Sequence, residues 1–298
     1  MLLHRYRFLL RTLGAIRFSA FPGPALRGAL GEHEEVYRTL LRPSASLPQK
    51  RFADPPRPLV LRPRFGAGTY GPDSLLELDV TLAGSAGAHI PALIRAMVRI
   101  GERGIGADRG PSSLDGRFHV ERVDAVGPGG CTSVVTHDGW VRPTSLPWRY
   151  PDDFTASPGH AATGLTLHFL TPAFVRRGDD PRGSLEFHHV VGDLLRRISL
   201  LAHAYGDGPV HSRHDELVKT DAATGVAVDD AAVRWMDVPR FSRNQRQAMT
   251  FGGWLGWVRY ATDVGPWLAL LGVGESLHVG KHTTFGFGAL TLHDSWQR

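Results

Sequence analysis

Cysteine, lysine and long hydrophobic runs are scarce in this chain of 298 residues. The scarcity of cysteine and that of hydrophobic runs each exclude a class of protein. The single cysteine, Cys131, excludes an internal disulfide and a zinc site built on cysteine ligands, and it is typical of a reducing cytoplasm. Four arginines interrupt the apolar N-terminal stretch, so the sequence predicts neither a membrane-spanning helix nor a signal peptide. We therefore expect a cytoplasmic protein with no membrane partner.

Positive charge is concentrated in the first fifth of the chain. Residues 1–64 hold 11 Arg and 1 Lys against 4 acidic residues, whereas the whole chain has a formal net charge of only +5. A basic surface raises the affinity for polyanions such as nucleic acid. The alternative is a solvated arginine-rich face, because the chain uses 31 Arg against 3 Lys throughout.

Hydrophobic residues make up 42% of the sequence, which is typical of a globular protein long enough for two cores. Periodicity predicts the elements of the first half. Strands are expected at residues 2–13, 59–61, 74–82 and 117–126, and helices at 25–41 and 90–100. In the second half, strands are expected at residues 165–169, 233–238, 254–261 and 285–292, and helices at 185–205 and 267–271.

Both halves follow the order strand, helix, strand, strand, helix, strand, which is the ferredoxin-like βαββαβ pattern. A stretch with four prolines at residues 143–159 separates them. The predicted class is therefore α+β with two tandem ferredoxin-like domains. The N-terminal domain is expected over residues 1–145, a linker over 146–160, and the C-terminal domain over 161–298.

The most distinctive segment is residues 272–288, GVGESLHVGKHTTFGFG, where five glycines and two histidines surround a lysine. Glycines let a backbone approach a ligand closely, and bare amides beside a lysine favour anions. The Walker and dinucleotide-binding patterns need glycines after a strand and before a helix, and here that order is reversed. We expect a loop that contacts the phosphates of a polymer, with an ordinary glycine-rich turn as the alternative.

Four segments carry a resemblance to a known family. They are residues 21–30 (FPGPALRGAL), 185–198 (LEFHHVV to LRRI), 242–256 (SRNQR to GGWLG) and 277–288 (LHVGKHTTFGFG). The chain resembles the CRISPR-associated endoribonucleases of the RAMP superfamily, which process CRISPR precursor RNA. The resemblance implies CRISPR repeat RNA as the partner, with other effector subunits as an open alternative.

The resemblance further implies cleavage without a metal or cofactor. The ribose 2′-hydroxyl attacks the adjacent phosphate and leaves 2′,3′-cyclic phosphate and 5′-hydroxyl ends. Such a reaction needs a base, an acid and a cation that stabilises the developing charge. Histidine suits the first two roles because its pKa lies near neutrality.

Two regions offer catalytic candidates. His33 lies in or just after the basic N-terminal helix, with Tyr37 four residues later on the same expected helix face. His278, Lys281 and His282 belong to the glycine-rich segment, and the sequence does not decide which histidine acts. The expected RNA-binding residues are Arg27, Arg240, Arg243, Arg246, Gly280, Thr283, Phe285, Gly286 and Gly288.

Other histidines and aromatics receive structural interpretations. The adjacent His188 and His189 are expected to point to different faces, one of them inward, and to serve packing. His211 and His214 lie in an expected loop and lack a third ligand, so no metal site is predicted. The tryptophans of the second half are expected in the core.

Three functions compete on this sequence: a processing endoribonuclease, a RAMP subunit that binds guide RNA without cutting it, and a general RNA-binding module. The first two share a fold, so the fold alone does not separate them. Histidines near both basic regions favour the enzyme.

Overall fold

The computed structural model describes the chain except residues 19, 44–55, 107–111, 136–143, 155–163, 209, 243–246, 262–263 and 295–298. It contains two compact units, Leu2–Trp148 and Arg149–Arg298, the second of which includes Met1. Across the described residues, every helix is too short or too polar to cross a membrane.

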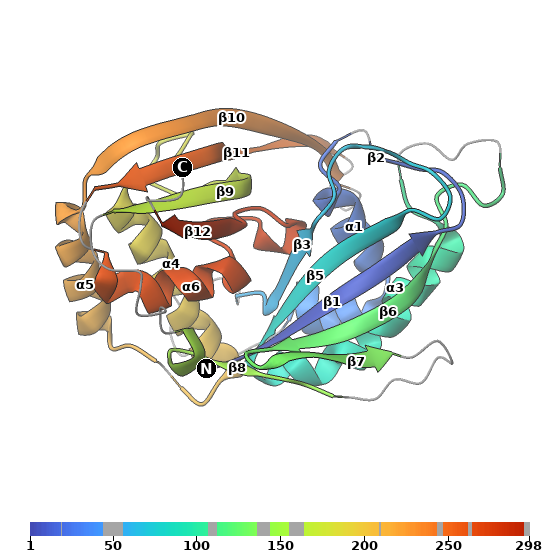
Figure 1. Cartoon of the computed structure of the whole chain (residues 1–298), viewed down its shortest axis with the longest axis horizontal. Helices are drawn as coiled ribbons and strands as arrows, with labels where there is room; N and C mark the ends of the chain where they lie inside the picture. The colour runs from blue at the N-terminus through green and yellow to red at the C-terminus, as the bar shows by residue number, and fades with distance from the viewer. Residues whose placement is uncertain are drawn as a thin grey trace. The chain divides into compact units, whose positions relative to one another are not determined.

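The N-terminal unit is built on one antiparallel sheet, with two helices on one of its faces (Figure 1). Its elements are β1 (Leu2–Thr12), α1 (Gly23–Leu30), β3 (Leu59–Pro63), β5 (Leu75–Ala83), α3 (Ile90–Arg103) and β6 (Phe118–Gly127). The strand order β3-β5-β1-β6 is that of a ferredoxin-like domain. Four further strands extend or accompany this core: β7 (Gly130–Val135) pairs with β6, β8 (Trp148–Arg149) pairs with β1, and β2 (Ile16–Phe18) forms a ribbon with β4 (Gly68–Tyr70).

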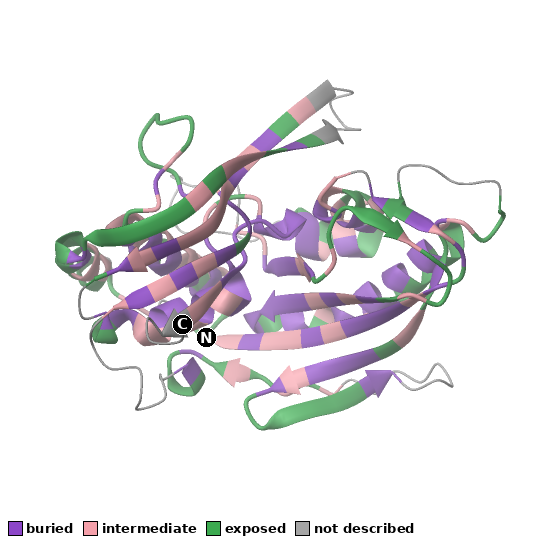
Figure 2. Ribbon diagram, turned by 45° about the horizontal axis from the view of Figure 1, so that its top comes forward, coloured by how far each residue is buried: buried purple, intermediate pink, exposed green. Residues whose placement is uncertain are grey.

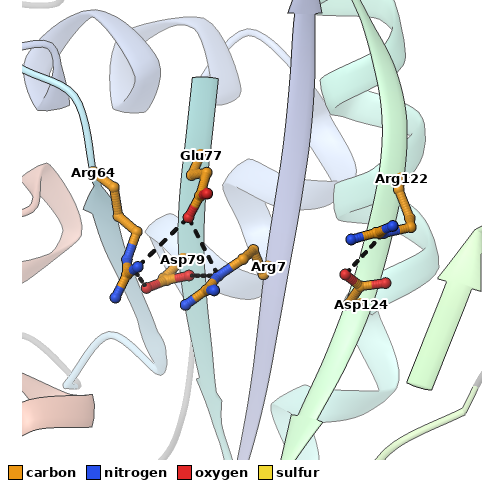
Figure 3. Close-up of polar contacts among 6 residues, drawn as sticks. All are labelled: Arg7, Arg64, Glu77, Asp79, Arg122 and Asp124. Carbon is orange, nitrogen blue, oxygen red and sulfur yellow. Dashed lines mark hydrogen bonds and ion pairs between the residues drawn. The ribbon is translucent and has the colours of Figure 1, made fainter. Parts of the chain in front are cut away.

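Alternation along β5 assigns its two faces. Leu76, Leu78 and Val80 are buried, whereas Glu77 and Asp79 point to the opposite face. That second face carries a charged network (Figure 3). Arg7 and Arg64 both pair with Glu77 and Asp79, and on the neighbouring strand Arg122 pairs with Asp124. Acidic residues therefore neutralise part of the arginine charge that the sequence concentrates in residues 1–64.

The C-terminal unit repeats the pattern around a second antiparallel sheet of order β10-β11-β9-β12. Its elements are β9 (Leu165–Ala173), α4 (Phe187–Tyr205), α5 (Arg213–Ala222), β10 (Val228–Ser242), β11 (Gln247–Tyr260), α6 (Leu268–Leu277) and β12 (Leu290–Asp294). The predicted fold of two tandem ferredoxin-like domains is confirmed. Much of β10 is exposed (Figure 2), whereas one face of α4 is buried in the core.

Two of the element predictions that involve histidines were wrong. The helix expected at residues 25–41 breaks after α1, because Glu32 and His33 close three-residue turns onto Ala29 and Leu30 and His33 is extended. The chain then forms the single turn α2 (Glu34–Val36) and a π-helical turn, η1 (Tyr37–Leu41). The segment with His211 and His214, expected as a loop, leads into α5, whose N-cap is Ser212.

The glycine-rich segment also begins later than expected. Gly272 and Gly274 belong to α6, and a Cβ on Gly274 would lie 3.1 Å from the Leu194 side chain. These two glycines thus serve close helix packing. Residues 285–288 are a turn instead of a strand, and β12 starts only at Leu290. Of the tryptophans expected in the core, Trp267 is buried and Trp254 and Trp257 are half-exposed.

Candidate functional site

The loop between α6 and β12, residues 278–289, is held by backbone hydrogen bonds within the C-terminal unit. Val279 N–H donates to the Gly288 carbonyl at 2.9 Å, which closes the loop on itself. Lys281 N–H donates to the Phe174 carbonyl at 3.0 Å, and Gly288 N–H donates to the Pro172 carbonyl at 2.9 Å. The loop is therefore anchored along β9 and the residue that follows it.

Two glycines of the loop cannot be replaced without strain. Gly280 has φ 81° and Gly288 has φ 73°, which is the left-handed region. An added Cβ would lie 2.3 Å from the Phe174 carbonyl oxygen at Gly280 and 1.8 Å from the Val279 carbonyl oxygen at Gly288. The glycine pattern that marks this segment in the sequence thus fixes the shape of its backbone.

Helix α4 holds the loop from the other side. Asp193 accepts a hydrogen bond from Gly280 N–H at 2.7 Å. Arg197 donates through Nε to the Leu277 carbonyl at 3.1 Å and through Nη2 to Thr283 Oγ1 at 2.8 Å. Burial lowers the pKa of Arg197 to about 10, so its guanidinium stays charged at neutral pH.

Sequence analysis missed this clamp. Asp193, Arg196 and Arg197 occur at spacing i, i+3 and i+4 along an otherwise apolar helix, which places them on neighbouring positions of one face. That spacing indicates a charged cluster on one face of α4, although it does not predict that the cluster binds the loop.

Lys281 is the exposed cation at the tip of the loop. Its ammonium lies 5.3 Å from the centroid of the Phe174 ring. Partial burial lowers the pKa of Lys281, and the nearby charges of Arg176 and Arg196 lower it further, against the opposing effect of Asp193. Arg196 pairs with Asp193 and Arg176 with Asp179, yet both arginines still disfavour the charge of Lys281, and a bound anion would offset this repulsion.

The two loop histidines have different environments. His278 is 1% exposed, and its Nδ1 donates to the Phe287 carbonyl at 2.9 Å, since a carbonyl can only accept. His282 is half-exposed, and its ring stacks on Phe251 with centroids 3.9 Å apart and planes 12° apart. His278 is therefore a structural residue of the loop, whereas His282 lies at its surface.

Most of the remaining loop residues predicted to bind RNA are buried. This group consists of Thr283, Phe285, Gly286 and Gly288. Phe285 packs edge-on against Phe251, and Thr283 is the partner of Arg197. The groups that the loop presents to solvent are concentrated at Gly280, Lys281 and His282.

The N-terminal unit holds the other candidate histidine, His33, at the start of α2. Its Nε2 is buried and has no hydrogen-bond partner among the described residues. Burial lowers the pKa of His33, and the charges of Arg99 and Arg103 on α3 lower it further. The imidazole is therefore neutral at pH 7 and lies beside two cations.

Three glutamates flank His33, and their negative charge would disfavour RNA. All three are paired with arginines: Glu32 with Arg103, Glu34 with Arg38, and Glu35 with Arg95. His33 and Tyr37 also do not share one continuous helix, because His33 is the extended N-cap residue of α2, and the Tyr37 hydroxyl accepts from Arg42 at 3.4 Å. Arg27 is half-buried on α1, and its backbone carbonyl accepts a hydrogen bond from Gly31 N–H at 3.0 Å.

The remaining predicted cations are only partly described. Arg240 lies on β10, and its side chain is outside the described part of the structure. Arg243 and Arg246 fall wholly outside the described residues. Their RNA-binding role stays a prediction.

Other histidines lie in two places. The rings of His188 and His189 are 3.9 Å apart and both half-exposed, so the expectation that the two residues point to different faces was wrong. His211 lies between the Tyr150 hydroxyl, 3.1 Å from Nε2, and the Lys219 ammonium, 3.3 Å from Nδ1.

Comparison with known proteins assigns the two units separately. Residues 167–290 match the family model of the CRISPR-associated endoribonuclease Cas6, and residues 1–146 match a model described as an N-terminal domain. None of the curated protein sequences compared with the chain matches it.

Solved structures match the chain over nearly its whole length. A Thermus thermophilus Cas6 product complex gives a TM-score of 0.58 at 16% identity, covering 98% of this chain and 99% of that chain. A second Cas6 product complex gives 0.52 at 19% identity, covering 98% and 100%. A partial Cas6-RT-Cas1–Cas2 complex gives 0.63 at 12% identity, covering 99% of this chain but 46% of the larger one.

Proposed function

We propose that the chain is a CRISPR-associated endoribonuclease of the Cas6 type, whose family model matches residues 167–290, and that it cuts CRISPR precursor RNA within the repeats. The observation that carries this proposal is the loop of residues 278–289, which lies inside the segment matched to the family. Its exposed Lys281 stands close to Arg176 and Arg196, and α4 fixes its backbone. Such a fixed group of cations fits one phosphate of an RNA backbone.

The proposed chemistry is an internal transesterification. The ribose 2′-hydroxyl loses its proton to a base and attacks the adjacent phosphorus, and the 5′-oxygen of the next nucleotide leaves with a proton from an acid. The products carry a 2′,3′-cyclic phosphate and a 5′-hydroxyl. Cations that contact the phosphate stabilise the extra negative charge of the transition state, and no metal ion is required.

We assign the acid–base role to His33 and the phosphate-binding role to the loop. A neutral imidazole can accept the 2′-hydroxyl proton, and the lowered pKa keeps His33 neutral at pH 7. An imidazole nitrogen without a hydrogen-bond partner is costly in a folded protein, and functional sites are one place where such atoms are kept. His282 is the rival, because its half-exposed ring lies next to Lys281.

The partners follow from the same proposal. Structural relatives include product complexes and a chain of a Cas6-RT-Cas1–Cas2 complex. We propose CRISPR repeat RNA as the substrate and association with other CRISPR proteins as a further property.

A cleavage assay in excess EDTA tests the proposal. Purified protein is incubated with a labelled repeat RNA and with a scrambled RNA of the same composition, and the product ends are analysed by phosphatase and kinase treatment. Cleavage at one repeat position, with ends that resist direct 5′-dephosphorylation and accept a 5′-phosphate, is expected. Tight binding of the repeat without cleavage would instead identify a guide-RNA-binding subunit. Equal binding of both RNAs would identify a general RNA-binding module.

Single-turnover rates assign the catalytic histidine. His33→Ala should lower the cleavage rate by at least about a hundredfold while repeat affinity holds, which is the range for loss of a general acid or base. His282→Ala should change affinity more than rate. If His282→Ala alone removes cleavage at unchanged affinity, the acid–base group lies in the loop.

A further inference from the structure

Glu186, His188 and His189 gather at the start of α4, two helical turns before the Asp193 that contacts the loop. Glu186 Oε2 lies 3.6 Å from His188 Nε2 and 3.5 Å from His189 Nδ1. One potential ligand atom from each residue lies within 4.8 Å of the other two; Glu186 is exposed, and the two histidines are partly buried. The arrangement joins two imidazoles and one carboxylate around one point.

The spacing fits a four-coordinate metal ion. Ligand bonds of about 2.1 Å at tetrahedral angles place neighbouring ligand atoms about 3.4 Å apart. The two distances to Glu186 Oε2 are within a few tenths of an ångström of that value. Two histidines and one glutamate with an open fourth position also form a ligand set used by zinc enzymes.

The neighbouring groups orient these ligands. Arg177 lies 3.6 Å from Glu186 Oε1, so the other carboxylate oxygen, Oε2, faces the imidazoles. Ser184 Oγ accepts a hydrogen bond from Glu186 N–H at 3.1 Å and lies 3.0 Å from His189 Nδ1. Such contacts around a ligand set fix its side chains before an ion arrives. The hydroxyl contact of His189 must be exchanged for the metal bond.

Electrostatics limits which ion can bind. The start of a helix carries positive partial charge and Arg177 is cationic, so both oppose a bare cation, whereas the carboxylate of Glu186 favours it. Neutral imidazoles bind Zn²⁺, Co²⁺ and Ni²⁺ far better than Mg²⁺ or Ca²⁺, which prefer oxygen ligands. Affinity for the hard cations should therefore be negligible.

We propose that Glu186, His188 and His189 form a binding site for a divalent transition-metal ion of the Zn²⁺ class, with water in the fourth position. The ion tethers the segment before α4 to the helix and stabilises the C-terminal unit. It takes no part in RNA cleavage. RNA cleavage is tested in EDTA and metal binding without RNA, so the proposed endoribonuclease activity and the proposed metal site can fail independently of each other.

Metal titration of the untagged full chain tests the site. After EDTA treatment and dialysis, Zn²⁺ binding is measured by calorimetry and Co²⁺ binding by the visible absorption of the bound ion. One ion per chain is expected, with the intense visible bands of four-coordinate Co²⁺ and no heat from Mg²⁺. Zn²⁺ should raise the melting temperature, since it binds the folded chain.

Variants locate the bound ion. His188→Ala and His189→Ala should each weaken Zn²⁺ binding at least about tenfold and remove the four-coordinate Co²⁺ spectrum, because each deletes one ligand. Glu186→Gln, which keeps the side-chain shape, should do the same if the alanine variants fold poorly. His203→Ala is the matched control, an exposed histidine in the last turn of α4. Binding that is absent in the native chain, or equal in the variants and the control, would overturn the proposal.

Discussion

At the scale of single residues, charge compensation separates cations that can bind RNA from those that only hold the fold. The nearby positive charges of Arg176 and Arg196 lower the pKa of Lys281, so a bound phosphate would relieve this repulsion. Arg259 illustrates the other case, because its guanidinium already bonds Asp229 at 2.6 Å. An uncompensated cation near others is the better candidate for a ligand contact.

Lys281→Ala should therefore weaken repeat-RNA binding by roughly ten- to a hundredfold. A charge-assisted contact to a phosphate contributes on the order of 1.5–3 kcal/mol. Filter binding or fluorescence anisotropy at one fixed salt concentration measures the effect, and melting should stay unchanged because Lys281 is exposed. Arg259→Ala is the matched control and should bind nearly as the native chain does. Equal losses for both variants would contradict a specific role of Lys281.

His278→Ala should destabilise the fold and affect RNA only indirectly. The change removes a buried ring and leaves the Phe287 carbonyl without its donor, which costs about 1–3 kcal/mol. Urea unfolding should show this loss, whereas His282→Ala should lose aromatic contacts of the loop, chiefly the stacking on Phe251, about 0.5–1.5 kcal/mol. A native-like stability for His278→Ala would show that the loop does not depend on this ring.

At the scale of elements, hydrogen bonds from α4 hold the loop of residues 278–289 in place. Asp193 and Arg197 reach the loop across 87 and 86 residues of sequence, respectively, and they fix both its backbone and the buried Thr283. The position of Lys281 is thus set by a helix that does not itself carry the glycine pattern.

Arg197→Met tests that coupling. Methionine fills a similar volume but removes the donors to Leu277 and Thr283, so stability should fall by about 1.5–3 kcal/mol. RNA affinity should fall as far as in Lys281→Ala, because the loop is no longer held. Arg196→Ala, at an exposed neighbouring position, should lower affinity with little change in unfolding. Normal affinity in Arg197→Met would mean that β9 alone positions the loop.

At the scale of the whole molecule, several histidines make stability depend on pH. Burial lowers the pKa of His4, His33 and His211, so the unfolded chain binds their protons at higher pH than the folded chain does. Lowering the pH below about 6.5, the pKa of a histidine in the unfolded chain, therefore lowers the free energy of unfolding. Above that pH these histidines are neutral in both states and the full stability is present. Burial also raises the pKa of Tyr150, the partner of His211, to about 12.

The free energy of unfolding should therefore be lower at pH 5 than at pH 7.5. Urea titrations at a series of pH values measure the slope. His211→Gln retains hydrogen-bonding groups but does not titrate, and it should reduce the slope between about pH 5 and pH 7. His214→Gln, at an exposed position on α5, is the control. A slope that is identical in both variants and the native chain would assign the pH dependence to other groups.

Salt dependence reports how many cations of the whole chain meet RNA. Arg7, Arg11 and Arg64 already pair with acids, so the slope of log affinity against log salt should reflect far fewer phosphate contacts than the arginines of residues 1–64. Lys281→Ala should reduce that slope by about one contact. RNA affinity measured from low to high salt, for the native chain and for Lys281→Ala, checks both slopes. An affinity that does not change with salt would contradict binding through phosphate contacts.

The sequence by itself determined the order of strands and helices, the doubling of the ferredoxin-like unit and the resemblance to CRISPR-associated endoribonucleases. Hydrophobic periodicity is a local property, so α3, α4 and β5 could be predicted from their own residues. The glycines at positions 280 and 288 were recognisable because positive φ restricts the residue type.

Only the tertiary structure decided which histidine of the loop is buried, which arginines are neutralised and which helix holds the loop. The sequence does not distinguish His278 from His282, but His278 bonds the Phe287 carbonyl and His282 stacks on the Phe251 ring. The break after α1 and the helical conformation of Gly272 and Gly274 were likewise missed. Burial and charge pairing depend on residues far apart in the chain, and local spacing carries no information about them.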